Sequence, residues 1–188
     1  MTPETPAIRL FVAAALPEWF KDPLEGTYPP YQHEAVRFVP RENLHLTLHF
    51  IGNISEARVP VLDEILQRLA RQFPPFRLRL QEIAPGPSLS HPRLIWARFA
   101  PDQVFEDVSL ALAKEIGSSS NPHPHPVPHV TLARLRKEKP KPKDLPVEKN
   151  LEVPELEVNS FSLWQSHLGQ PHPPYVVLKT YPLATMSE

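Results

Sequence analysis

Two tetrapeptides of one pattern are the residues of this chain best suited to chemistry. The first is His45-Leu46-Thr47-Leu48 and the second is His129-Val130-Thr131-Leu132. On a β-strand successive side chains point to opposite faces, so each copy would present its imidazole and hydroxyl on one face. An imidazole has a pKa near 6.5, so at neutral pH one His can accept a proton while another donates one. The two copies together predict general acid–base chemistry, with the threonine hydroxyls donating hydrogen bonds to a charged oxygen.

The alternative is that both copies are ordinary amphipathic strands whose His and Thr face solvent, as these residue types commonly do. A single His-x-Thr would be weak evidence, because short patterns arise by chance. Two copies with matching apolar neighbours, close to half a chain length apart, are much harder to attribute to accident. We therefore predict that two strands bring both His and both Thr to one site.

The composition excludes several classes of function. The chain has 188 residues, a net charge of −1 and no cysteine, so thiolate catalysis and Cys-ligated metals are excluded. Only five Gly are present against 26 Pro, and no glycine-rich phosphate loop occurs, which argues against a nucleotide cofactor. No run approaches the roughly 20 apolar residues that span a bilayer. We expect a monomeric cytoplasmic protein that has no contact with a membrane.

Hydrophobic periodicity places the two motifs among strands and helices. Alternating or continuous apolar residues predict strands, and apolar residues spaced three and four apart predict helices. Asp102 is the expected N-cap of the second helix and Gly117 its end. The expected strands are 7–15, 35–39, 44–51, 76–81, 94–99, the second motif, 155–165 and 175–181, and the expected helices are 60–72 and 102–116.

The element order predicts an α+β fold with two similar lobes. Each lobe would hold one His-x-Thr strand, an antiparallel sheet and a helix, with the two sheets facing each other across a central groove. We expect residues 1–188 to form one bilobal domain, with the first motif in a lobe built mainly from 1–95 and the second in a lobe built mainly from 96–188. Exchange of strands between the lobes is compatible with this pattern.

The chain resembles the 2H phosphoesterases, a family named for two His-x-Thr motifs, and within it the bacterial and archaeal RNA 2′,3′-cyclic phosphodiesterases once called 2′-5′ RNA ligases. The resemblance spans nearly the whole chain. It rests on both motifs and on the segments Arg9–Ala13, Leu16-Pro17, Arg37–Leu48, Phe50–Gly52, Pro92–Trp96, Pro128–Arg134 and Tyr175–Leu183, which occur in the family's order.

The resemblance implies an activity and assigns roles. The substrate would be an RNA or oligonucleotide with a 2′,3′-cyclic phosphate end, hydrolysed to a 2′-phosphomonoester without metal or cofactor. His45 would be the proton donor and His129 the proton acceptor. Thr47 and Thr131 would bind the phosphate. The same site acting in reverse would join a cyclic phosphate end to a 5′-hydroxyl without ATP, by 2′-5′ ligation.

Two further residues leave alternatives open. Arg134 resembles a family arginine near the phosphate, but strict alternation from His129 would turn it to the opposite face unless the strand twists or ends. It could equally be a surface arginine that begins the run of basic residues 134–143. His49 continues the face of His45 and Thr47 at period two, so it could line the cleft or merely cap the strand.

Two other functions compete with the phosphodiesterase. His123, His125 and His129 form an H-x-H-x-x-x-H pattern that would suit a metal-binding protein, although the interleaved prolines favour a solvated loop. A catalytically silent module that binds RNA ends on the same scaffold is the other alternative. Phe11, Trp96, Trp164 and Tyr175 could stack a base, but aromatic residues at strand spacing are more often core, so the sequence identifies no base pocket.

Overall fold

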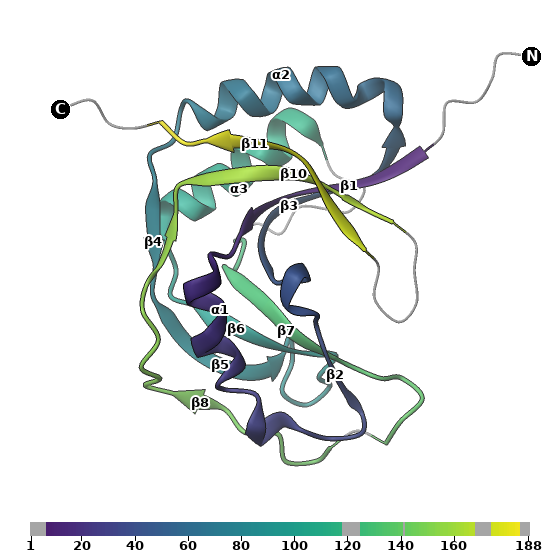
Figure 1. Cartoon of the computed structure of the whole chain (residues 1–188), viewed down its shortest axis with the longest axis vertical. Helices are drawn as coiled ribbons and strands as arrows, with labels where there is room; N and C mark the ends of the chain where they lie inside the picture. Colours follow the sequence, from purple (N-terminus) through teal and green to yellow (C-terminus); the bar gives the residue numbers. More distant parts are fainter. Residues whose placement is uncertain (1–6, 118–124, 141, 168–173, 185–188) are drawn as a thin grey trace, which may run out of the picture.

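A computed structural model describes residues 7–117, 125–140, 142–167 and 174–184 of the chain (Figure 1). The α-helices are α1 (Glu18–Glu25), α2 (Val59–Ala70) and α3 (Gln103–Ile116), and short 3-10 turns are η1 (Pro29–Tyr31), η2 (Arg41–Asn43) and η3 (Glu56–Arg58). The strands are β1 (Ala7–Ala15), β2 (Val36–Phe38), β3 (His45–Ser55), β4 (Phe76–Leu78), β5 (Leu80–Gly86), β6 (Leu94–Phe99), β7 (His129–Leu135), β8 (Glu148–Lys149), β9 (Leu156–Val158), β10 (Ser160–Ser166) and β11 (Tyr175–Pro182).

The strands form one large antiparallel sheet whose two halves meet at the motif strands. Its order is β11-β10-β1-β3-β7-β6-β5-β8, and β2 also pairs with β7. Strands β3 and β7 are joined only at Leu46 and Val130, so the sheet divides there. We call β11, β10, β1 and β3 the β3 lobe, and β7, β6, β5, β8 and β2 the β7 lobe. The expected α+β fold with two lobes is confirmed.

The chain exchanges strands between these lobes. Strands β10 and β11 come from the C-terminal part of the chain but lie beside β1 in the β3 lobe, whereas β5 and β6 come from the middle of the chain and lie beside β7. The expected division near residue 95 therefore does not describe the lobes. Two predicted strands are also interrupted: 76–81 is divided between β4 and β5, and 155–165 between β9 and β10. Strands β4 and β9 pair with each other as a separate ribbon.

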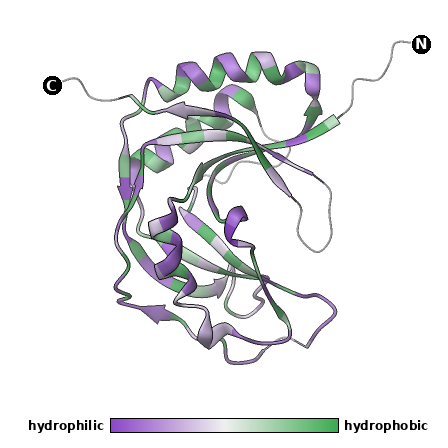
Figure 2. Ribbon diagram, viewed as in Figure 1, coloured by the Kyte–Doolittle hydropathy of each residue, from purple (hydrophilic) through white to green (hydrophobic). Residues whose placement is uncertain are grey.

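Helices α2 and α3 lie together on one side of the β3 lobe (Figure 1). Helix α2 buries Leu62, Leu66 and Leu69 in the main core, and Figure 2 shows hydrophobic residues alternating with hydrophilic ones along the helix. Helix α3 begins as predicted, because the carboxylate of Asp102 accepts a hydrogen bond of 2.9 Å from the Phe105 amide. Gly117 ends it with a φ of 78°, which favours glycine. Both helices thus cover the same lobe, rather than one helix covering each.

Helix α1 packs on the β7 lobe and was not predicted. Pro23 lies inside this eight-residue helix, where proline is usually unfavourable. Tertiary packing outweighs this propensity, because Phe20 and Leu24 are fully buried and the Phe20 ring stacks on Phe99 of β6 at 6.2 Å. The Tyr31 hydroxyl extends this contact by donating a hydrogen bond of 3.0 Å to the Ile83 carbonyl. No helix among the described residues is long and apolar enough to cross a membrane.

Candidate active site

The single pairing between the two lobes brings both motifs together. Leu46 and Val130 are directly opposite each other and fully buried on the face that the core covers. Their sequence neighbours must therefore point to the other face, which we call the site face. His45 and Thr47 flank Leu46, and in the antiparallel partner His129 and Thr131 flank Val130, so all four partly exposed side chains share this face around an approximate two-fold axis.

Both imidazoles are held by the same local hydrogen bond. His45 Nδ1 lies 2.6 Å from the carbonyl oxygen of Asn43, and His129 Nδ1 lies 2.8 Å from that of Val127. A carbonyl oxygen can only accept, so Nδ1 must carry the hydrogen in both rings. The neutral rings therefore keep Nε2 unprotonated and able to accept a proton. The carbonyl two residues before each His carries no side-chain signal, so sequence reasoning could not identify it.

The surroundings of both imidazoles favour the neutral form. Burial lowers the pKa of His45 from 6.5 to about 4, although the hydrogen bond to Asn43 opposes this and the charges of Arg134 and His129 add to it. Burial also lowers the pKa of His129, with a further contribution from Arg134. A bound anion would reverse part of this effect, because negative charge nearby stabilises an imidazolium. Binding of an anion should therefore be accompanied by protonation of one of the two imidazoles.

A β-bulge places Arg134 on the site face. Across β6 and β7, Trp96 is opposite Thr131 but Ile95 is opposite Ala133, so Leu132 is the extra residue. The bulge reverses the alternation, and Arg134 lies opposite Leu94, two residues from Trp96 and on the same face of β6. Strict alternation would have turned Arg134 away. The bulge therefore decides the orientation of Arg134, and the electrostatic effect of Arg134 on both imidazoles agrees with this position. A contact between Arg134 and the phosphate stays a prediction.

A matching bulge in β3 removes His49 from the site. Against β1, Ala13 is opposite Thr47 and Val12 is opposite His49, so Leu48 is the extra residue. His49 is consequently turned to the helix side of the sheet, where its Nε2 lies 2.8 Å from the Gly117 carbonyl at the end of α3. Phe50 takes the position on the site face that corresponds to Arg134 in the other motif. His49 therefore has a structural role and does not line the site.

Aromatic side chains surround the imidazoles, most densely on the β3 lobe. The ring of His45 lies 5.0 Å from Phe11, 5.7 Å from Trp164 and 5.4 Å from Tyr175. On the β7 lobe, Trp96 lies 4.9 Å from the ring of His129. These four residues, which sequence reasoning treated mainly as core, form the apolar wall that desolvates the two bases.

Strand β5 approaches Trp96 closely at Gly86. A Cβ placed on this glycine would lie 2.5 Å from Trp96 Cε2, well inside van der Waals contact. Only glycine therefore allows the indole to occupy its position beside His129. Gly86 supports the β7 side of the aromatic wall through this contact.

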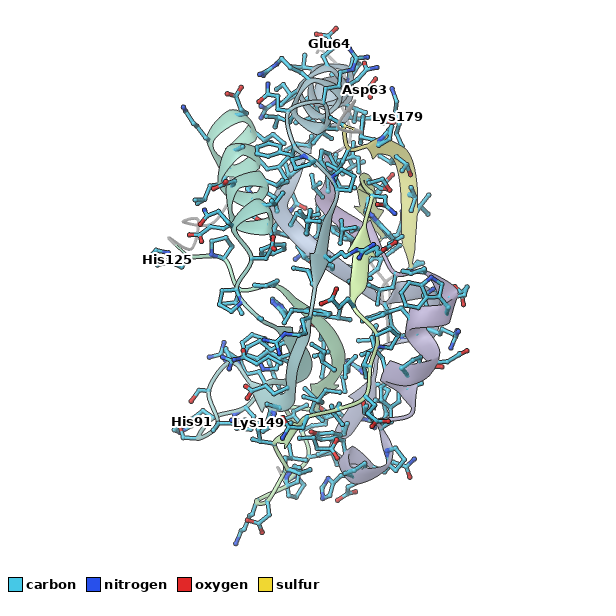
Figure 3. The ribbon with its side chains drawn as sticks, turned by 90° about the vertical axis from the view of Figure 1, so that its left-hand side faces the viewer. Asp63, Glu64, His91, His125, Lys149 and Lys179 are labelled. Carbon is cyan, nitrogen blue, oxygen red and sulfur yellow. The ribbon has the colours of Figure 1, made fainter. Side chains whose placement is uncertain are left out.

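Of the histidines of the alternative metal site, His125 contacts α3 and has no contact with His129 in the part of the chain that the structure describes. His125 lies near α3, and its Nδ1 is 3.1 Å from a carboxylate oxygen of Glu106, whereas His91 lies on a separate loop (Figure 3). His123 is outside the described residues. Within the described ranges, no three His, Asp or Glu side chains are grouped so as to hold a metal ion.

Comparison with known proteins gives a consistent result. A family model for the 2′-5′ RNA ligase superfamily matches residues 19–170. A protein of Methanothermobacter thermautotrophicus named RNA 2′,3′-cyclic phosphodiesterase is 26% identical over 182 residues, 94% of this chain and 99% of that protein. A protein of the same name from Methanocaldococcus jannaschii is 32% identical over 89 residues, so this match spans 47% of the chain and about half (49%) of the relative.

Solved structures also resemble this chain over almost its whole length. The crystal structure of TT0787 from Thermus thermophilus superimposes with a TM-score of 0.80 at 30% identity, and the match covers 96% of this chain and all of that one. The similarity therefore extends over both lobes and both motif strands. An arrangement of two imidazoles, two hydroxyls and a guanidinium on one face can bind an anion and exchange protons with it.

Proposed function

Since the chain belongs to the 2′-5′ RNA ligase superfamily, we propose that it hydrolyses RNA 2′,3′-cyclic phosphodiester ends to 2′-phosphomonoesters with its two motif histidines as acid and base. The observation that carries the proposal is the pairing of Leu46 with Val130, which puts both imidazoles on one face with Nε2 available on each. Relatives named RNA 2′,3′-cyclic phosphodiesterase support the choice of substrate.

In the proposed reaction, the cyclic phosphate lies between the imidazoles. His129 accepts a proton from water as the water oxygen bonds to phosphorus, and the bond from phosphorus to O3′ breaks. Protonated His45 donates its proton to the departing O3′, which becomes a hydroxyl and leaves the phosphate on O2′. The hydroxyls of Thr47 and Thr131 donate hydrogen bonds to the nonbridging oxygens as negative charge increases there.

We assign His129 as the acceptor on the family resemblance, and the surroundings of the two rings agree with it. The hydrogen bond that holds His129 is exposed, whereas the one that holds His45 is partly buried beneath aromatic rings. Water therefore reaches His129 more readily than His45. Because burial lowers the pKa of His45 in the free protein, the negative charge of the bound phosphate must raise that pKa before His45 can act as the donor.

The same arrangement would catalyse ligation in reverse. A 5′-hydroxyl in place of water would attack the cyclic phosphate, displace O3′ and form a 2′-5′ phosphodiester. No nucleotide cofactor is needed, because the cyclic ester already contains the bond that is exchanged. Water is present at far higher concentration than RNA ends, so we expect hydrolysis to dominate.

The lowered pKa values predict an acidic optimum. In the free protein both histidines are largely neutral at pH 7, so the form with one protonated imidazole becomes more abundant as pH falls below 6.5. We expect kcat/KM to rise over this interval and to fall again when both rings are protonated near pH 4. NMR titration should show the pKa of His45 rising on addition of 2′-AMP. An unchanged His45 titration at saturating 2′-AMP would contradict the proposed position of the phosphate.

The direct test uses an RNA with a 2′,3′-cyclic phosphate terminus, incubated with purified protein in EDTA, followed by identification of the product isomer by ³¹P NMR. A 2′-phosphomonoester formed at an undiminished rate in EDTA is the expected result. Loss of turnover on chelation, restored by a divalent metal, would favour the metal-site alternative. Tight binding without any turnover would identify a silent RNA-end-binding module.

A further inference from the structure

Two arginines stand side by side on the site face of the β7 lobe. Arg37 of β2 is directly opposite Arg134 of β7 in the antiparallel register. Residues in this relation share a face with their Cβ atoms about 5 Å apart. Arg37 therefore lies on the site face with Arg134, on the same edge of β7 that pairs with β3.

This arrangement is unfavourable unless an anion joins it. Like charges directly opposite each other destabilise a sheet. In the part of the chain that the structure describes, neither Arg37 nor Arg134 forms an ion pair, whereas Arg41, Arg68, Arg77 and Arg98 each do. The Nε of Arg37 is also buried without a hydrogen-bond partner. A buried donor without a partner carries an energetic cost, so the free protein holds the two guanidinium groups in an unfavourable arrangement. An anion beside them would offset the repulsion between the two like charges.

The two lobes present different chemistry to a bound nucleic acid. Around His45 the β3 lobe presents the rings of Phe11, Trp164 and Tyr175. Beyond His129 the β7 lobe presents two guanidinium groups, one at the bulge and one on the neighbouring strand. A second phosphate attached to the first would therefore find its cations on β7 and β2. On the site face of the β3 lobe, Arg9 is the one cation among the residues that the structure describes. Its guanidinium carbon lies 5.0 Å from the centroid of the Phe50 ring.

We propose that Arg37 binds the phosphodiester that links the terminal nucleotide to the rest of the RNA, next to the cyclic phosphate that Arg134 and the motif residues hold. This proposal rests on the function proposed above and adds a substrate class. The site would be built for an oligonucleotide end, and cyclic mononucleotides, which have no second phosphate, would be poorer substrates.

The test compares 2′,3′-cyclic AMP with the dinucleotide ApA that ends in a 2′,3′-cyclic phosphate. We expect R37Q to reduce kcat/KM for the dinucleotide at least about tenfold more than for the mononucleotide. Dinucleotide affinity should also depend less on salt concentration in R37Q, because one salt-screened contact between a guanidinium and a phosphate is lost. The matched controls are R9Q on the β3 lobe and R71Q at the exposed end of α2, which should keep the wild-type ratio between the two substrates.

A change in the substrate provides a test that does not depend on how the variant folds. With the wild-type protein, kcat/KM should be about tenfold lower for a dinucleotide whose internal phosphodiester is replaced by an uncharged methylphosphonate than for the unmodified dinucleotide. For this methylphosphonate dinucleotide, R37Q should have the same kcat/KM as the wild-type protein. Equal losses for both substrates with R37Q, or full activity on the methylphosphonate, would overturn the proposal.

Two further outcomes separate this inference from the function on which it rests. A dinucleotide-specific loss in R9Q and not in R37Q would place the RNA on the β3 lobe and refute the role of Arg37. If the wild-type protein hydrolyses neither substrate, the proposed function fails. In that case, fluorescence anisotropy would compare the affinity of a labelled dinucleotide 2′-phosphate for the wild-type protein and for R37Q. The role of Arg37 requires that R37Q bind this dinucleotide more weakly.

Discussion

The variants H45A and H129A should each lose about 100- to 10,000-fold or more in kcat on a 2′,3′-cyclic phosphate RNA. General acid and general base catalysis are each worth about 10²–10⁴ in rate, and in the proposed mechanism each imidazole transfers one proton. The double variant should lose little more than either single variant, because the two histidines act as one unit. Single-turnover kinetics at saturating RNA would measure the chemical step directly.

The pH profiles of these variants distinguish the two roles. H129A lacks the proposed base, so its residual rate should rise with hydroxide concentration and lose the limb that His129 titration produces. H45A lacks the proposed acid, so a substrate analogue with a better leaving group than O3′ should restore part of its rate. The matched control is H91A, an exposed loop residue, which should keep wild-type kinetics. Near-normal turnover in H45A or H129A would exclude the two-histidine mechanism.

The variants T47V and T131V should lose about 10- to 1,000-fold in kcat; removal of one donor to a charged oxygen typically costs about 10²–10³. Valine keeps the β-branched shape of threonine, so the strand and its pairing should be preserved and only the hydroxyl removed. The effect should fall mainly on kcat rather than on KM, because charge on the nonbridging oxygens is greatest in the transition state.

Conservative substitutions make this test specific. T47S and T131S keep a hydroxyl and should retain activity within about tenfold, judged from the same single-donor range. The approximate two-fold symmetry of Leu46 and Val130 further predicts comparable losses for the two valine variants. Wild-type kcat in both valine variants would show that the hydroxyls do not contact the phosphate.

The local pattern of apolar and polar residues was sufficient to predict the positions of most of the strands and of two helices. Alternation in the two motifs fixed which side chains share a face, and three- and four-residue spacing predicted α2 and α3 to within a few residues. Asp102 and Gly117 marked the ends of α3 because capping depends on a few adjacent residues. Helix α1 was missed because its stability comes from Phe20 and Leu24 buried against distant strands.

The amino-acid sequence by itself determined the chemistry available to this protein: two His-x-Thr strands, no cysteine and no glycine-rich phosphate loop. Only the tertiary structure decided which neighbours join them. The bulges at Leu48 and Leu132 remove His49 from the site face and place Arg134 on it, beside Arg37. A bulge depends on the register with partner strands that are distant in sequence, so the alternation within one segment does not reveal it.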